Sequence, residues 1–310
     1  MPPIKGSPDA AATYLRGVCP RWDVPPGPAG VETSGRSSAA RRSPALGLTL
    51  GSGLGVLAEQ MEDSVVVPYK DVPGMAASTA PGHRGEFRVG VWRGVPVIAL
   101  SGRLHAYEGH DPATLTYPVE VLAAMGVSHL VVSCAAGGLN PRFRVGELVA
   151  IDEHLSWLGG RMGACPQLLG DAGHGGSAGD ALPPVPLPGM ATCDPGLLQA
   201  AIEAAFDHSF VLHRGTYLAV TGPSYESRAE CRMMRGLAVD VVGMSTVPEL
   251  LVASRLGLAV LGVAVVTNMA VPDAGGVADH GQVLASSKRA AGRLTRVVER
   301  ILQSIRPDAT

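Results

Sequence analysis

The feature that most constrains this chain is a succession of short apolar runs, each closed by glycine or small polar residues. The runs Leu46–Leu50, Ser128–Cys134 and Leu258–Thr267 have the length and composition of buried strands. Helical patterns lie between them, and strands that alternate with helices build α/β domains. The sequence therefore predicts a single α/β domain with a central mixed, mostly parallel β-sheet flanked by helices.

The remaining elements follow from turn signals and from helical periodicity. Phe87–Trp92 and Val95–Leu100 flank Arg93-Gly94 and predict a β-hairpin. Further strands are predicted at Glu147–Ile151, Thr216–Val220 and Val239–Val242. Helices are predicted at Val56–Met61, Pro118–Met125, Leu197–Phe206, Ser227–Arg235, Glu249–Leu256 and at the carboxyl end, where Leu294 to Ile305 carry one apolar face.

Two segments depart from this pattern. In residues 1–44, a short helix is predicted at Pro8–Val18, and the Pro-, Gly-, Ser- and Arg-rich stretch Pro20–Pro44 predicts a mostly unpacked, dispensable extension. Two other interpretations of residues 1–44 stay open: a helix followed by a long linker, and an incorrectly assigned start codon. The domain itself is expected over residues 45–306. From Trp157 to Pro188 the pattern gives way to Gly, Pro and small residues, which predicts a long functional or disordered loop.

Charge and cysteine usage exclude several classes of function. The formal net charge is −2 and only 4% of residues are aromatic, so we expect neither a basic nucleic-acid-binding surface nor an aromatic surface that stacks on RNA bases. Five cysteines without CxxC spacing argue against a disulfide framework or a zinc site and favour a reducing cytoplasm. No signal peptide is evident, and the longest apolar run is shorter than the roughly 20 residues of a membrane span.

Candidate functional residues stand where predicted strands end. Gly51-Ser52-Gly53-Leu54-Gly55 follows a strand and opens a helix, where backbone N–H groups and the Ser52 hydroxyl can hold an anion. It lacks the lysine of a P-loop, and a tight turn without a ligand explains it equally well. After the hairpin, Arg103, His105 and Tyr107 share one side of an extended segment, and an arginine binds phosphate with two hydrogen bonds. An ordinary surface loop is the alternative.

Four further strand ends carry ligand-type groups. Cys134–Asn140 is small enough for a ligand to reach backbone amides, and Tyr225-Glu226 offers a ring and a carboxylate for a planar base. Ser245 is an anion donor or a helix cap, and the buried Asn268 beside Thr267 needs partners. Tight turns and helix starts explain each of them singly. Together they predict one pocket at the carboxyl edge of one sheet, for an anion, a sugar and a planar base.

These residues together resemble the trimeric purine nucleoside phosphorylases, a family that also holds methylthioadenosine phosphorylases. The matching pieces run in family order from about Ala45 to Ile305. They are GSGLG, APGH (which stands for VPGH with its first residue changed), SGRLHAYEGH, AAGGLNP, GPSYE, AECR, VGMSTVPE and VTN. The resemblance implies a homotrimer that cleaves inosine, guanosine and their 2'-deoxy forms with inorganic phosphate to free base and (deoxy)ribose 1-phosphate. It implies no metal and no cofactor, since phosphate is a co-substrate.

The resemblance also assigns roles residue by residue. It implies a phosphate pocket of Ser52, His83, Arg103, His105, the Ala135 backbone and Ser245. It places Tyr107, Met244 and His280 around the ribose, with His280 on the 5'-hydroxyl. It implies that the base is bound by Tyr225, Glu226, Thr267 and Asn268. His105, Glu226 and Asn268 are then the catalytic residues, with Asn268 on the purine N7 and Glu226 on N1–H of a 6-oxopurine.

The sequence departs from the family pattern in three places. Cys134 stands where the family usually has Asn, and the segment Trp157–Pro166 offers no clear equivalent of the aromatic residue that a neighbouring subunit supplies. Asp171–Pro188 lacks the usual acidic and aromatic pattern and is mostly Gly, Ala and Pro. Two alternatives therefore stay open: a methylthioadenosine or methylthioinosine phosphorylase, which Asn268 and His280 disfavour, and a non-catalytic member with a degenerate lid.

Overall fold

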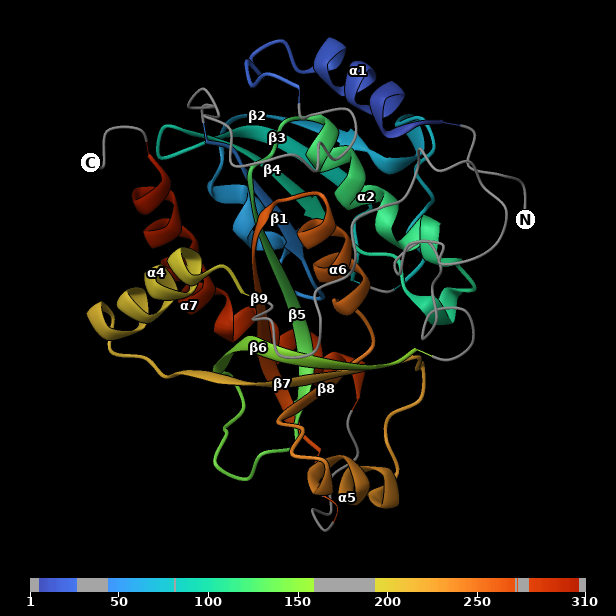
Figure 1. Cartoon of the computed structure of the whole chain (residues 1–310), viewed down its shortest axis with the longest axis vertical. Helices are drawn as coiled ribbons and strands as arrows, with labels where there is room; N and C mark the ends of the chain where they lie inside the picture. The colour runs from blue at the N-terminus through green and yellow to red at the C-terminus, as the bar shows by residue number, and fades with distance from the viewer. Residues whose placement is uncertain are drawn as a thin grey trace.

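A mixed β-sheet with helices on both faces organises the chain (Figure 1). The structure, a computed structural model, describes residues 6–26, 44–80, 82–158, 193–270, 272 and 279–306. The strands are β1 (Leu46–Leu50), β2 (Glu62–Pro68), β3 (Glu86–Trp92), β4 (Val95–Ser101), β5 (His129–Gly138), β6 (Leu148–Trp157), β7 (Leu212–Val220), β8 (Val241–Gly243) and β9 (Ala259–Met269). The helices are α1 (Pro8–Val18), α2 (Pro112–Ala124), α4 (Pro195–Asp207), α5 (Arg228–Gly236), α6 (Val247–Arg255) and α7 (His280–Ile305), with single turns η1 (Gly55–Gln60), η2 (Tyr69–Asp71) and η3 (Ala106–Glu108).

The strand pairings confirm the predicted fold class. Strand β1 pairs in parallel with β4 and β5, β5 with β9, and β7 with β6 and β8. The pairs β2–β3, β3–β4, β5–β8 and β6–β9 are antiparallel. Five of the nine pairings among the described strands are therefore parallel. Strand β2 was not expected from the sequence, because only one of its residues is fully buried and its apolar alternation is weak.

Alternation along the central strands gives each face of the sheet its own core. On β9, Leu261, Val263 and Val265 pack with residues of α4 and α7, whereas Ala264 and Val266 pack with residues of α2 and α6. Figure 1 shows α4 and α7 together on one side of the sheet and α2 and α6 on the other. Burial on both faces explains why β5 and β9 read as continuous apolar runs.

The N-terminal segment differs from the expected unpacked extension. Helix α1 forms at the predicted Pro8–Val18, but Leu15, Trp22 and Val24 are buried in the same core as α2. The Trp22 Nε1–H donates to the Met125 carbonyl over 3.0 Å, and Arg16 Nη2 donates to the same oxygen over 2.8 Å. For the described residues up to 26 the expectation of an unpacked chain is wrong, because Trp22 and Val24 stand in a Pro-rich stretch and carry no helical or strand period. Residues 27–43 lie outside the described part of the chain.

Strand β8 leads the chain into the region where β5 and β9 end. It is three residues long and pairs antiparallel only with Gly137 and Gly138, the last two residues of β5. Because β8 is antiparallel to β5, the carboxyl ends of these two strands point in opposite directions. The single-edge arrangement predicted from the sequence is therefore too simple, since the pocket lies where the end of β5 pairs with the antiparallel β8.

Candidate active site

One cavity of about 300 Å³ collects the side chains that the sequence singled out. Its walls include twelve of the thirteen candidate residues: Ser52, His83, Arg103, His105, Tyr107, Ala135, Tyr225, Glu226, Met244, Ser245, Thr267 and Asn268. The thirteenth, His280, begins α7, and its side chain lies outside what the structure describes. Ala136, Gly137, Pro223, Val242, Gly243 and Val283 complete the wall and had not been singled out one by one.

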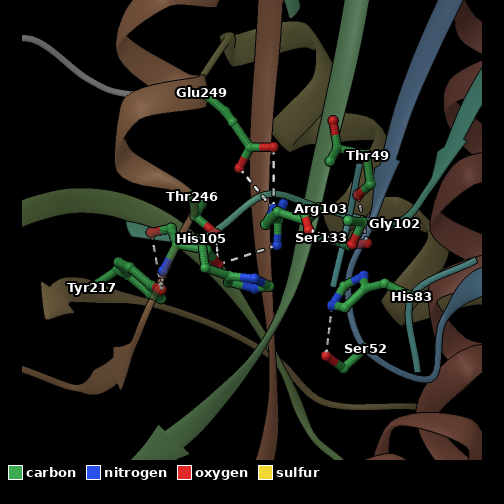
Figure 2. Close-up of polar contacts among 12 residues, drawn as sticks. Thr49, Ser52, His83, Gly102, Arg103, His105, Ser133, Tyr217, Thr246 and Glu249 are labelled. Atoms are coloured by element: carbon green, nitrogen blue, oxygen red, sulfur yellow. Dashed lines mark hydrogen bonds and ion pairs between the residues drawn. The ribbon is translucent and has the colours of Figure 1, made fainter. Parts of the chain in front are cut away.

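The turn after β1 brings Ser52 to the cavity. Gly53 has φ +78°, and a Cβ there would lie 2.9 Å from the Leu284 carbonyl oxygen of α7, so the turn needs glycine for its conformation and for its close packing. Ser52 Oγ then lies 3.1 Å from His83 Nε2 (Figure 2). Ser52 and His83 come from separate segments, and their contact joins two of the candidate anion ligands.

Arg103 follows β4 and is buried in the cavity wall. Its side chain is 3% exposed, and its Nε lies 2.9 Å from Glu249 Oε2 and donates to Oε1 over 3.1 Å. Its Nη1 donates to Ser245 Oγ over 3.2 Å. Burial opposes the charge, but Glu249 outweighs it and raises the pKa of the guanidinium. Arg103 is thus a fixed cation at all ordinary pH values.

His105 is held in one orientation by Glu108. Its backbone N–H donates to Glu108 Oε1 over 2.8 Å, and its Nδ1 lies 2.9 Å from the same oxygen. Burial would raise the pKa of the Glu108 carboxyl, but hydrogen bonds from Thr79 and His105 lower it to about 2, so it is ionised and accepts the Nδ1 proton. Burial lowers the pKa of His105 to about 4. The neutral ring therefore keeps Nε2 as a hydrogen-bond acceptor.

A ring stack extends this arrangement toward the sugar side of the cavity. The His105 and Tyr107 rings are stacked with centroids 4.8 Å apart, and His83 meets His105 edge-on at 5.2 Å. Glu108 was missed in the sequence, although its position three residues after His105 is that of a capping box, which the structure contains. Glu249 was likewise treated only as a helix residue.

A β-bulge places the amide of Asn268. On β9, Val266 pairs with Ala136 and Asn268 pairs with Gly137, so Thr267 is the extra residue. The Thr267 hydroxyl lies 3.2 Å from the Ala136 carbonyl and 3.1 Å from Asn268 Oδ1. The bulge turns two successive residues of one strand toward the same cavity, which strict alternation would forbid.

Tyr225 and Glu226, two of the candidate base ligands, also line the cavity. Glu226 is half-buried between β7 and α5, and burial raises the pKa of its carboxyl. Tyr225 stays 42% exposed at the cavity mouth. Met244 and Ser245 follow β8, and the Tyr217 hydroxyl holds the Ser245 carbonyl at 3.2 Å. The lining of the cavity therefore includes both a cation, Arg103, and a carboxylate, Glu226.

The departures noted in the sequence have different outcomes. Cys134 is fully buried in β5 and does not line the cavity among the described residues. Trp157 is the last residue of β6 and not the first of a loop, because β6 continues its pairing with β7 as far as Val220. Residues 159–166 and 171–188 lie outside the described part of the chain.

Comparison with known proteins agrees with the cavity. Residues 45–303 match the phosphorylase superfamily. The chain is 38% identical to purine nucleoside phosphorylase 1 of Bacillus subtilis over 84% of this chain and 92% of that protein. It is 36% identical to the Bos taurus purine nucleoside phosphorylase over 86% and 91% of the two chains.

Solved structures show the same likeness. Schistosoma mansoni purine nucleoside phosphorylase in complex with adenosine superimposes with a TM-score of 0.74 at 33% identity, covering 84% of this chain and 90% of that one. The complex of that enzyme with inosine gives a TM-score of 0.71 at 30% identity, with the same coverage. Sequence, fold and cavity lead to one conclusion: the chain belongs to the phosphorylase superfamily, among its purine nucleoside phosphorylases.

Proposed function

We propose that the protein cleaves purine nucleosides with inorganic phosphate, giving the free base and (deoxy)ribose 1-phosphate. The observation that carries this proposal is that Arg103, His105 and Ser52 line one cavity together with Glu226 and Asn268. A nucleoside and a phosphate held by these two groups of ligands meet in that cavity at the glycosidic bond. The relatives named above are purine nucleoside phosphorylases.

Phosphate binds to Arg103, Ser52, Ser245 and the Ala135 backbone, with His83 at the edge. Arg103 supplies the charge, and the hydroxyl groups add donors, as anion recognition requires. The neutral His105 accepts a hydrogen bond from a phosphate hydroxyl through Nε2. This set orients one phosphate oxygen toward the anomeric carbon of the sugar.

Cleavage of the glycosidic bond leaves positive charge on the sugar and negative charge on the purine. Asn268 hydrogen-bonds the purine N7 as it gains a proton, and Glu226 accepts from N1–H, so both stabilise the leaving base. The proton is the one that the phosphate hydroxyl gives up when a phosphate oxygen bonds to C1. The phosphate below the sugar stabilises the cation and then captures C1. Tyr107, Met244 and His280 hold the ribose, with His280 on the 5'-hydroxyl. Catalysis consists of positioning and electrostatics, without a covalent enzyme intermediate and without a cofactor.

The preferred substrates are 6-oxopurine nucleosides, inosine and guanosine with their 2'-deoxy forms. Asn268 and Glu226 support this choice, because a site that hydrogen-bonds one set of edge groups rejects a mismatched base by about 10⁴-fold. A methylthioadenosine preference would need a different residue at Asn268, and a preference for either methylthio nucleoside would need an apolar group at the position of His280.

The working enzyme is a cytoplasmic homotrimer. Four cysteines of the described part are buried and free, which suits a reducing compartment. No helix in the described ranges is long and apolar enough to cross a membrane. We expect the neighbouring subunit to close the nucleoside site only in part, because the sequence after Trp157 offers Met162 and no aromatic residue.

Release of hypoxanthine from inosine, followed with and without phosphate, tests the proposed reaction. Phosphate-dependent release is expected, and equal release without phosphate would indicate a hydrolase. No release in either buffer, from a folded protein, would favour a non-catalytic member of the family. Arg103→Ala should raise the KM for phosphate or abolish turnover.

A further inference from the structure

The guanidinium of Arg103 is fixed along one edge by a carboxylate that the proposed reaction does not use. Nε lies within 3.1 Å of both Glu249 oxygens, and both side chains are at least nine-tenths buried. Figure 2 shows Glu249 above Arg103, on the side away from His83 and Ser52. A guanidinium is planar and its donors form a rigid fork, so a contact at Nε sets the direction in which both Nη groups point.

The guanidinium of Arg103 still has a donor to spare. Nη1 donates to Ser245 Oγ over 3.2 Å, whereas Nη2 is buried and has no hydrogen-bond partner among the described residues. A buried donor without a partner is costly. Since Arg103 lines the cavity, an anion seated there would supply the missing acceptor.

The backbone before α6 brings Glu249 and Ser245 to the same guanidinium. Thr246 has φ +76° and ψ −51°, and the Val247 N–H donates to the Ser245 carbonyl over 2.9 Å, which together make a γ-turn. This conformation is rare and strained for a β-branched residue. It lets Ser245 and Glu249, which are four residues apart, contact two nitrogens of the Arg103 guanidinium.

Helix capping alone does not explain Glu249. It sits in the first turn of α6 and accepts a backbone hydrogen bond from Thr246, as a capping glutamate does. Glu230 has the equivalent position on α5, where it accepts from the Ser227 N–H over 2.7 Å and remains exposed. Only Glu249 adds a buried arginine to that role, so Glu230 provides a matched control.

We propose that Glu249 is a positioning residue for the phosphate co-substrate, which it serves by holding Arg103 in the orientation that binds the anion. The proposal rests on the proposed function, because it assigns phosphate to Arg103. Glu249 itself touches neither substrate. It acts through the guanidinium and leaves the nucleoside ligands Glu226 and Asn268 undisturbed.

The sign of the effect separates positioning from plain electrostatics. Glu249→Gln removes a negative charge near a bound anion, and this by itself would tighten phosphate binding and lower its KM. Loss of the charged hydrogen bonds that orient Arg103 acts in the opposite direction, by about 10- to 100-fold. Positioning therefore predicts a higher KM for phosphate in a variant that carries one negative charge less.

The experiment measures steady-state phosphorolysis of inosine with each substrate varied in turn. Glu249→Gln is expected to raise the KM for phosphate about tenfold or more while the KM for inosine stays within about twofold. Glu230→Gln should leave both constants at the wild-type values. An unchanged or lower phosphate KM in Glu249→Gln overturns the proposal. Absence of phosphate-dependent turnover in the wild type would instead refute the proposed function.

A second measurement keeps the proposal testable if the Glu249→Gln protein fails to fold. In an Arg103→Met background no buried cation remains, so Glu249→Gln strands no charge and instead removes the carboxylate that Arg103→Met leaves unpaired. The kcat/KM for phosphate of Arg103→Met/Glu249→Gln should then be no lower than that of Arg103→Met, because Glu249 has no guanidinium left to orient. A further drop of about tenfold in the double variant shows an independent role and overturns the proposal.

Discussion

Truncation of Trp22 should destabilise the protein without touching its chemistry. The Trp22 side chain is 7% exposed and packs in the core that contains Leu15 and α2. Buried Trp→Ala changes cost about 3–5 kcal/mol. The lower end applies here, because the Met125 carbonyl that Trp22 binds still accepts from Arg16. We therefore expect a loss of about 3 kcal/mol and a fall in Tm of roughly 6–9 °C.

Differential scanning calorimetry of Trp22→Ala and the wild type provides the measurement. Val18→Ala is the control, since Val18 lies on the exposed side of α1 and should shift Tm by less than about 2 °C. Turnover of inosine at low temperature should match the wild type, because no residue of α1 lines the cavity. A Trp22→Ala protein with unchanged Tm would refute the packing of residues 6–26 on the domain.

Three other perturbations address the site. Asn268→Asp should relax the discrimination against 6-amino purines, which competition between inosine and adenosine measures; adenosine as the best wild-type substrate would contradict the base assignment. The folded pKa of His105, about 4, lies below the ordinary value of 6.5, so its burial costs stability as pH falls from about 6.5 to about 4. His105→Gln should thus lose less stability than the wild type over that pH range. Equal losses in the free energy of unfolding of the two proteins would contradict this prediction. Light scattering should give three times 31.8 kDa, and Trp157→Ala should raise the inosine KM only if Trp157 closes a neighbouring site; a fully active monomer would refute the shared site.

Much of the fold could be read from the sequence because the central strands are buried on both faces. Strands β5 and β9 appear as continuous apolar runs, and the carboxyl-terminal helix shows a clean apolar face. Weaker patterns failed where tertiary contacts decide. Strand β2 has one fully buried residue, and Trp22 and Val24 sit in a Pro-rich segment without a period, yet both segments pack in the structure.

The cavity was predictable as a set of strand ends, but its internal geometry was not. Ser52, Arg103 and Ser245 each follow a strand and Asn268 is the penultimate residue of β9, and strand ends are where α/β sheets gather ligands. The ion pair of Arg103 with Glu249 joins residues 146 positions apart, and no local pattern signals it. The bulge at Thr267 depends on register with β5, which only the folded sheet defines.

The central claim is that phosphate is the nucleophile, and the sugar product tests it most directly. Inosine and inorganic phosphate should be incubated with the protein and followed by ³¹P NMR. A new phosphate monoester resonance, ribose 1-phosphate, should grow in proportion to the hypoxanthine released, and Arg103→Ala should suppress both signals. Hypoxanthine that accumulates with free ribose and no new phosphorus resonance would contradict the account, because water would then be the nucleophile.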